Sequence, residues 1–245
     1  MKRLFDRKDM LILSYGRLEN EQNLVFQVNV RRISIYILEE GTILDEFIKN
    51  KNVIQYLDHF IIFLPEKKEF QNLFWKEFYS IFGKDYEKII NTSNNIFCMN
   101  EMIHYMKENA NIGNQSMLLD YGCGSGLSLY TDYIGRLVGY EPVYTMRQQA
   151  LKRGMHVLGS HAFNMLPDDY FDAAFACYVF HLSIQEKSIY QLSQKMKKEA
   201  VLVANFYKDI DVVRINRIFD KLNYRVMKIT DIQERFGSIY EYVKR

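Results

Sequence analysis

From about residue 115 onward, short apolar runs alternate with segments whose apolar residues recur at helical spacing. The apolar runs predict strands at 117–121, 137–140, 156–160, 171–177 and 200–206. The periodic segments predict helices at 126–134, 145–153, 185–197 and 211–222. Two last runs, 224–229 and 238–243, predict a closing antiparallel strand pair. This alternation indicates an α/β fold with a parallel sheet and helices on both of its faces.

The first 84 residues do not follow this pattern. Apolar runs at 24–30 and 33–38 predict a strand pair, and the run at 60–64 predicts a strand stopped by Pro65. Helical spacing predicts helices at 43–49, 70–82 and 87–108, the last of them broken near 91–93. We therefore expect a small α+β module at 1–84 and a second domain at 85–245, which pack together because no low-complexity linker separates them.

Composition narrows the class of protein. A chain of 245 residues can form one substantial domain and a smaller one. The formal net charge of +2 and the lack of a long Lys/Arg block argue against a nucleic-acid surface. The three cysteines are widely spaced without a Cys-x-x-Cys pair, which argues against a disulfide framework and a metal site.

Localisation is expected to be cytoplasmic. The start of the chain, 1–8, meets charged residues before any long apolar core, unlike a signal peptide. The longest apolar stretch, near 60–64, is far too short to cross a bilayer, so we expect no membrane partner.

The segment after the first strand of the second domain carries the clearest chemical signal. An acid, Asp120, is followed by glycines at every second position, Gly122, Gly124 and Gly126. Glycine adopts positive φ and lets a ligand approach the main chain, and such a loop after a strand builds nucleotide sites at the carboxyl edge of α/β sheets. The dinucleotide pattern Gly-x-Gly-x-x-Gly fails because leucine stands at the last position in either register, and no Gly-Lys-Ser/Thr follows.

Residues 120–126, Asp-Tyr-Gly-Cys-Gly-Ser-Gly, resemble the first motif of the class I S-adenosylmethionine (SAM)-dependent methyltransferases, Asp-x-Gly-x-Gly-x-Gly. The stretch 139–142, Gly-Tyr-Glu-Pro, is similar to their second motif, and Leu-Pro at 166–167 and Phe-Asp at 171–172 match later landmarks. The resemblance implies a Rossmann-like, seven-stranded, mostly parallel sheet with an antiparallel last strand. It also implies SAM as the cofactor and S-adenosylhomocysteine as its product.

The resemblance also implies a set of cofactor-binding residues. Glu141 would accept hydrogen bonds from both ribose hydroxyls, and the loop backbone would contact the methionine portion of SAM. Asp120 would orient the loop or reach the ammonium group, although a role in capping the next helix is equally open. The implied cofactor-binding set is Asp120, Tyr121, Gly122, Cys123, Gly124, Gly126, Glu141, Pro142, His161, Ala162 and Cys177.

The residues expected near the adenine and the two cysteines differ from the rest of that cofactor-binding set. The acid usual at the adenine is replaced by Ser160 or His161, so backbone contacts from Ala162, with His161 or Phe163 near the ring, are the expected substitute. A purely structural His161 remains an alternative. Cys123 and Cys177 have no cationic or metal-binding neighbours in sequence and look like small packing residues.

The segment 177–182 is where the resemblance places the acceptor side of the site. His181 could remove a proton from an acceptor hydroxyl or ammonium, because histidine titrates near neutrality, or it could be a structural residue at a helix start. The expected pocket aromatics are Tyr86, Tyr178 and Phe180. The Asp/Asn-Pro-Pro-Tyr/Phe motif of amino-methylating DNA and protein enzymes is not found here.

These observations predict methyl transfer from SAM to an oxygen or nitrogen of a small molecule or short peptide, in bacterial specialised metabolism. The alternatives are an RNA or protein methyltransferase with an N-terminal docking domain, and a non-catalytic SAM-binding partner subunit. Residues 1–84 would then be a cap over the substrate pocket, a homodimerisation element, or a peptide-recognition module that resembles winged-helix modules. With 70–95 they would form a lid.

Overall fold

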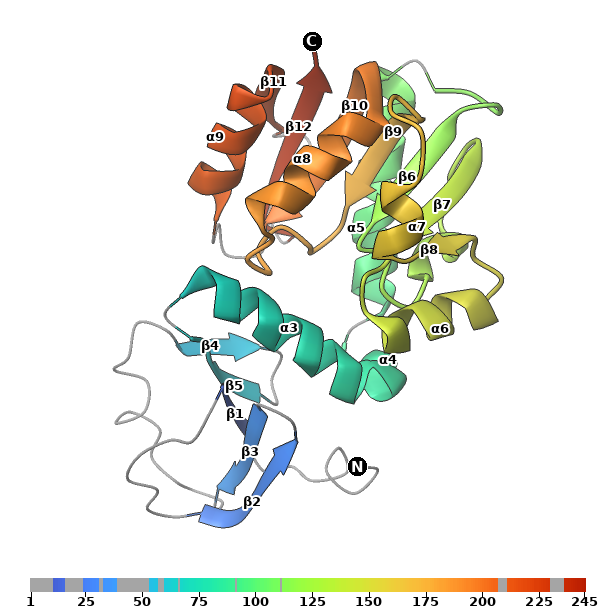
Figure 1. The fold of residues 1–245 in the computed structure, drawn as a ribbon. Coiled ribbons are helices and arrows are strands. Elements are labelled where there is room, and N and C mark those ends of the chain that lie inside the picture. Colours follow the sequence, from blue (N-terminus) through green and yellow to red (C-terminus); the bar gives the residue numbers. More distant parts are fainter. Residues whose placement is uncertain are drawn as a thin grey trace. The chain divides into compact units, whose positions relative to one another are not determined.

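The computed structural model describes residues 11–15, 24–30, 33–38, 53–56, 60–65, 67–90, 92–110, 112–206, 211–229 and 236–245. The chain divides into two compact units, residues 1–91 and 92–245 (Figure 1). The helix expected at 43–49 lies outside the described residues. None of the described helices combines the length and apolarity that a membrane span requires.

The first unit contains a five-stranded sheet in the order β2-β3-β1-β5-β4. Its strands are β1 (Leu11–Tyr15), β2 (Leu24–Val30), β3 (Ile33–Leu38), β4 (Val53–Tyr56) and β5 (Phe60–Phe63). The expected β2–β3 pair is antiparallel, and β1 lies between β3 and a parallel β5. A helix, α3 (Lys68–Phe82), follows and leads through the 3-10 helix η1 (Gly83–Asp85) into α4 (Tyr86–Ile89).

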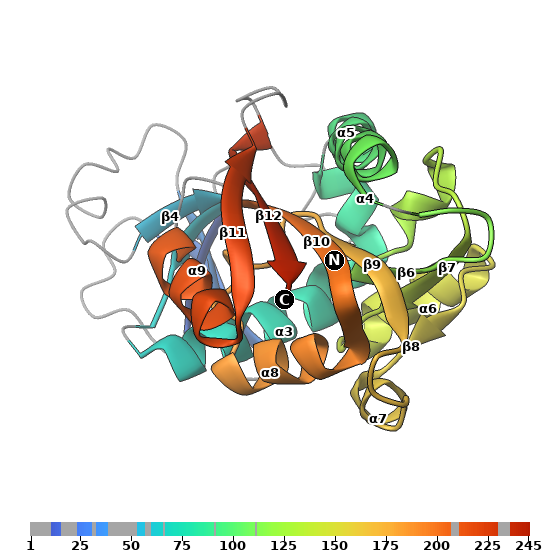
Figure 2. The ribbon, with the colours of Figure 1, turned by 90° about the horizontal axis from the view of Figure 1, so that it is seen from above.

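The second unit is built on a seven-stranded sheet in the order β11-β12-β10-β9-β6-β7-β8 (Figure 2). β12 runs antiparallel to β10 and β11, and the other described strand pairs of this sheet are parallel, so the expected Rossmann-like sheet with an antiparallel last strand is confirmed. The strands are β6 (Met117–Tyr121), β7 (Arg136–Tyr140), β8 (Val157–Leu158), β9 (Phe171–Ala176), β10 (Met196–Phe206), β11 (Tyr224–Ile229) and β12 (Ser238–Lys244).

Helices cover both faces of this sheet. The helix α5 lies on one face, and α8 and α9 lie on the other (Figure 2). The helical elements of this unit are α5 (Thr92–Asn109), the 3-10 helix η2 (Leu127–Tyr130), α6 (Tyr144–Lys152), α7 (Ser160–Asn164), α8 (Glu186–Lys195) and α9 (Val212–Lys221).

Two expected elements are shorter than the sequence pattern indicated. The helix expected at 126–134 is only η2, because Gly126 enters it with a left-handed backbone and Thr131 leaves it in an extended one. The strand expected at 156–160 is the two-residue β8, because Ser160 already begins α7.

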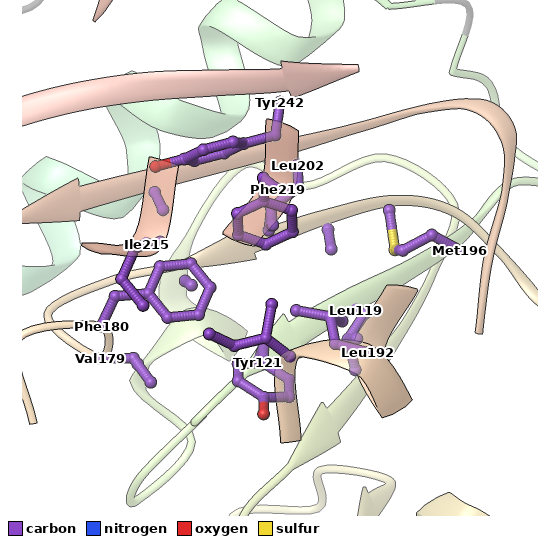
Figure 3. Close-up of a cluster of buried hydrophobic side chains, with 14 of the residues drawn as sticks. Leu119, Tyr121, Val179, Phe180, Leu192, Met196, Leu202, Ile215, Phe219 and Tyr242 are labelled. Carbon is purple, nitrogen blue, oxygen red and sulfur yellow. The ribbon is translucent and has the colours of Figure 1, made fainter. Parts of the chain in front are cut away.

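The core between the sheet and the α8–α9 layer is aromatic and aliphatic. Figure 3 shows Phe180, Phe219 and Tyr242 gathered beside Leu119 and Leu202, and all five side chains are fully buried. The ring centroids of Phe219 and Tyr242 lie 4.3 Å apart. Burial of such large side chains is the main stabilising term for this layer. The same packing holds the ends of β6, β9 and β10 in place, next to the candidate functional site.

Candidate functional site

The loop after β6 has the backbone geometry that its glycines predict. Gly122, Gly124 and Gly126 all have positive φ, at 80°, 56° and 84°. The N–H groups of Gly122 and Cys123 donate to the carbonyl of Tyr140 at 2.8 and 3.0 Å. The loop is thereby folded against the end of β7. A Cβ at Gly122 would lie 2.6 Å from Val179 Cγ2, so this position admits only glycine without a local shift.

Glu141 joins the loop to the second strand. The residue directly follows β7, and it is 6% exposed. Its Oε2 accepts a hydrogen bond from Gly124 N–H at 3.0 Å, and its Oε1 accepts one from Val143 N–H at 2.7 Å. Burial raises the pKa of this carboxyl from 4.5 to about 7, although the two N–H donors oppose that shift. Two segments of the expected cofactor site therefore meet at one carboxylate.

Arg147 on α6 is a site residue that the sequence reasoning missed. Its Nη1 donates to the backbone carbonyl of Glu141 at 2.7 Å. Its positive charge also lowers the pKa of the Glu141 carboxyl. A Cβ at Gly159 would lie 3.0 Å from Arg147 Cζ, so the guanidinium fills the space beside that residue. Pro142 begins the short turn from Glu141 into α6.

The Asp120 carboxylate forms a hydrogen bond with the element after the loop. It is 2% exposed, and Ser128 Oγ in η2 donates to its Oδ2 at 2.5 Å. Burial raises the pKa of the Asp120 carboxyl from 3.8 to about 7, against the Ser128 hydrogen bond. Ser128 also accepts a hydrogen bond from Thr131 Oγ1 at its carbonyl, at 2.6 Å. The carboxylate therefore ties the end of β6 to η2.

An aromatic stack supports the ends of β6 and β7. The rings of Tyr121 and Tyr140 stack with centroids 5.0 Å apart, and Phe163 of α7 lies 4.5 Å from Tyr140. Phe163 is 1% exposed and belongs to the core. His161 and Ala162, its neighbours on α7, are exposed. Of the residues expected near adenine, Phe163 thus packs inside the unit and the other two face outward.

The segment after β9 holds the residues expected on the acceptor side. Tyr178 has a left-handed backbone with φ of 56°, and its N–H donates to Asn205 Oδ1 at 2.6 Å. His181 is 8% exposed, with its ring centroid 6.5 Å from that of Tyr178. Burial lowers the pKa of the His181 imidazole from 6.5 to about 4, and the Asp211 carboxylate opposes this shift.

The remaining expected residues occupy different surroundings. Phe180 is fully buried in the core, 5.9 Å from both Phe206 and Phe219 (Figure 3). Burial raises the pKa of the Cys177 thiol well above its ordinary value, with Cys98 as its hydrogen-bond partner. Tyr86 belongs to α4 of the first unit, where its ring packs edge-on against Tyr79.

A groove of about 480 Å³ lies along α9, from Asp211 to Lys221. Its walls carry acidic and basic side chains, and one pair of them is bonded, with Arg214 Nε donating to Asp211 Oδ1 at 3.3 Å. The residues lining it include Glu186, Asp211, Arg214, Arg217, Ile218 and Lys221. Among the described residues, no group of three or more His, Cys, Asp or Glu side chains is arranged to hold a metal ion.

Comparison with known proteins finds similar solved structures but no similar family model or curated sequence. No protein-family model matches the chain, and no curated protein is detectably similar to it in sequence. Magnesium protoporphyrin IX methyltransferase from Synechocystis, solved with bound SAM, has a TM-score of 0.52 and 13% identity over 71% of this chain and 97% of its own. A SAM-dependent methyltransferase assigned in Methanococcus maripaludis has a TM-score of 0.53 and 11% identity over 68% and 93%.

The strand order, the single antiparallel strand and these two similar structures agree. The chain therefore contains the class I SAM-dependent methyltransferase fold, with its glycine loop and Glu141 at the carboxyl ends of two adjacent parallel strands.

Proposed function

We propose that the chain is a SAM-dependent methyltransferase that acts on an oxygen or nitrogen of a small molecule or short peptide. The observation that carries the proposal is the hydrogen bond from Gly124 N–H to Glu141 Oε2. It brings a glycine loop and a buried carboxylate together at the edge of the sheet where α/β folds bind nucleotides. Similarity in fold to a methyltransferase solved with bound SAM supports the same cofactor.

The residues at this edge fit the chemistry of SAM. Each Glu141 oxygen accepts one backbone N–H and keeps lone-pair capacity for a ribose hydroxyl. A Cβ at Gly124 would approach nothing closer than 3.4 Å, the distance to Met146 Cε, so the loop leaves room beside its backbone. Glu141 would hold the ribose, and residues 121–126 would hold the methionine portion.

SAM supplies a methyl group on a sulfonium, which is already an activated leaving group. The chain then has to hold the acceptor atom in line with the methyl and the sulfur, and such alignment is a large source of rate acceleration. His181 is neutral at pH 7, because its pKa lies near 4, and its imidazole is able to accept a proton. A base so weak contributes less than one with a pKa near 7, so alignment would dominate.

The proposal is tested by calorimetric titration of the full chain with SAM and with S-adenosylhomocysteine. At pH 8, where Glu141 is mostly ionised, both should bind, and Glu141→Ala should weaken each by at least about tenfold, because it removes charged acceptors whose hydrogen bonds contribute about 1.5–3 kcal/mol each. Glu199→Ala, which removes an exposed acid on β10, is the control. Absence of binding to the intact protein, or equal affinity in Glu141→Ala, would overturn the assignment.

Turnover separates an enzyme from a SAM-binding partner subunit. Release of S-adenosylhomocysteine on incubation with candidate hydroxyl, amine and peptide acceptors would support catalysis. Tight SAM binding with no turnover on any of these acceptors would instead favour the partner subunit. Binding to RNA that weakens steeply with salt would favour an RNA substrate.

A further inference from the structure

Asn205, the last residue but one of β10, is a fully buried polar side chain that uses both ends of its amide. Its Oδ1 accepts a hydrogen bond from Tyr178 N–H at 2.6 Å. Its Nδ2 donates to the carbonyl of Phe236 at 3.0 Å and contacts Cys98 Sγ at 3.4 Å. A buried amide with this set of partners fixes its neighbours, because leaving any of them unpaired costs about 1–3 kcal/mol.

The partners of Asn205 come from three other segments of the second unit. Tyr178 lies in the segment after β9, Cys98 in α5, and Phe236 just before β12. The ring of Phe236 also packs against Phe97 of α5 at 5.6 Å. A single side chain therefore joins the ends of β9 and β10 to a helix and to the start of β12.

The bond to Tyr178 holds a backbone that is otherwise unfavourable. A non-glycine residue in the left-handed region costs about 1–2 kcal/mol, and Tyr178 has φ of 56°. The chain then turns, with Leu182 N–H donating to the carbonyl of Val179 at 3.0 Å. His181 lies inside that turn. The backbone conformation at Tyr178 therefore determines where His181 is placed after the end of β9.

Other residue types would not satisfy these partners. Aspartate would keep the acceptor for Tyr178 N–H but would place a carboxylate oxygen against the Phe236 carbonyl. Leucine or valine would remove both of these hydrogen bonds from the interior. The amide of asparagine carries an acceptor and a donor on one short side chain, which is what these two backbone groups require.

We propose that Asn205 is a positioning residue, which holds Tyr178 in its left-handed conformation and thereby places Tyr178 and His181 on the acceptor side of the site. The consequence for methyl transfer rests on the proposed function, whereas the placement of His181 can be measured without it.

The experiment compares Asn205→Ala with a matched control, Asn216→Ala. Asn216 on α9 also accepts a hydrogen bond at its Oδ1, but the donor is Tyr242 Oη of β12, at 2.6 Å, and not a group of the segment after β9. The readout is the NMR titration of the His181 ring, assigned with His181→Gln. In Asn205→Ala the freed segment should admit water, and the pKa of His181 should rise from about 4 by about one pH unit or more.

In Asn216→Ala the His181 titration should match that of the unsubstituted protein, although stability falls. Asn205→Thr, whose β-branched side chain suits a strand, replaces Asn205→Ala if the latter does not fold. A folded Asn205 variant with an unchanged His181 titration would overturn the positioning role. SAM affinity, measured in parallel, should change less than about threefold, or 0.7 kcal/mol. A protein that fails to bind SAM but shows the His181 shift would reject the proposed function and keep this inference.

Discussion

Glu141 should contribute to a pH dependence in the stability of the second unit, and Glu141→Gln should remove that contribution while the one from Asp120 remains. The carboxyl is buried, and its pKa is about 7 in the folded protein against 4.5 for an ordinary glutamate. Between these values the folded chain keeps a proton that the unfolded chain has released. The contribution of Glu141 to stability is therefore most favourable below pH 4.5, falls as the pH rises to about 7, and stays low above it.

The size of the effect follows from the two pKa values. A difference between 4.5 and about 7 corresponds to about 3 kcal/mol in the free energy of unfolding. Glutamine has no titrating group. Its amide NH₂ faces either Gly124 N–H or Val143 N–H, so Glu141→Gln loses one backbone hydrogen bond, and the energy of that loss is the same at every pH. The difference between the two proteins should consequently shift by about 3 kcal/mol between pH 4.5 and 8.

The assay must report on the second unit. The single tryptophan, Trp75, lies in the first unit, so its fluorescence is unsuitable. Urea unfolding at four pH values between 4.5 and 8 can instead be read by hydrogen-exchange pulses at one fixed pH, with mass spectrometry of peptides that cover β6 and β7. Glu199→Gln, an exposed acid, serves as the control. Parallel pH curves for Glu141→Gln and the unsubstituted protein would show that burial does not raise the pKa of Glu141.

Further outcomes concern the loop, the cofactor and the acceptor side. Gly122→Ala should lower the free energy of unfolding by about 2–4 kcal/mol, because the alanine would have to adopt a positive φ and its Cβ would also clash with Val179. Gly154→Ala, with φ of 88° and open space, should cost only about 1–2 kcal/mol in the same urea titration. An equal loss of stability in Gly122→Ala and Gly154→Ala would show that the Val179 side chain moves aside. SAM affinity should weaken as the pH falls below about 7, because protonation of Glu141 removes its charge; a flat calorimetric profile from pH 6 to 8 would contradict this. His181 should remain neutral in NMR spectra at pH 5.5, and a protonated ring there would contradict its burial.

The sequence predicted the second unit better than the first. The apolar runs from 117 to 243 each belong to one strand, and the βα alternation orders them along the chain, so the sheet could be inferred without knowing any contact. In the first unit, β1 and β4 were not predicted. They are runs of only five and four residues, and the pairing of β1 with β5 spans a long stretch of chain that local periodicity does not report.

Within the site, motif positions were predictable but partners were not. The positive φ of the loop glycines and the place of Glu141 follow from residue type and spacing. The contacts of Asp120 with Ser128 and of Arg147 with the Glu141 carbonyl depend on how η2 and α6 pack. Asn205 did leave a signal, since it is the one polar residue in the apolar run 200–206. Such a residue in a buried strand needs hydrogen-bond partners.

The place of β12 in the sheet has a consequence for biosynthesis. This strand lies between β10 and β11 and pairs with both of them, yet it is made after either. Until the ribosome has released residues 238–244, β10 presents an open edge and β11 has no neighbour in the sheet. Unpaired edges are sites where partly folded chains associate. The nascent protein is therefore most exposed to aggregation in the interval just before β12 emerges.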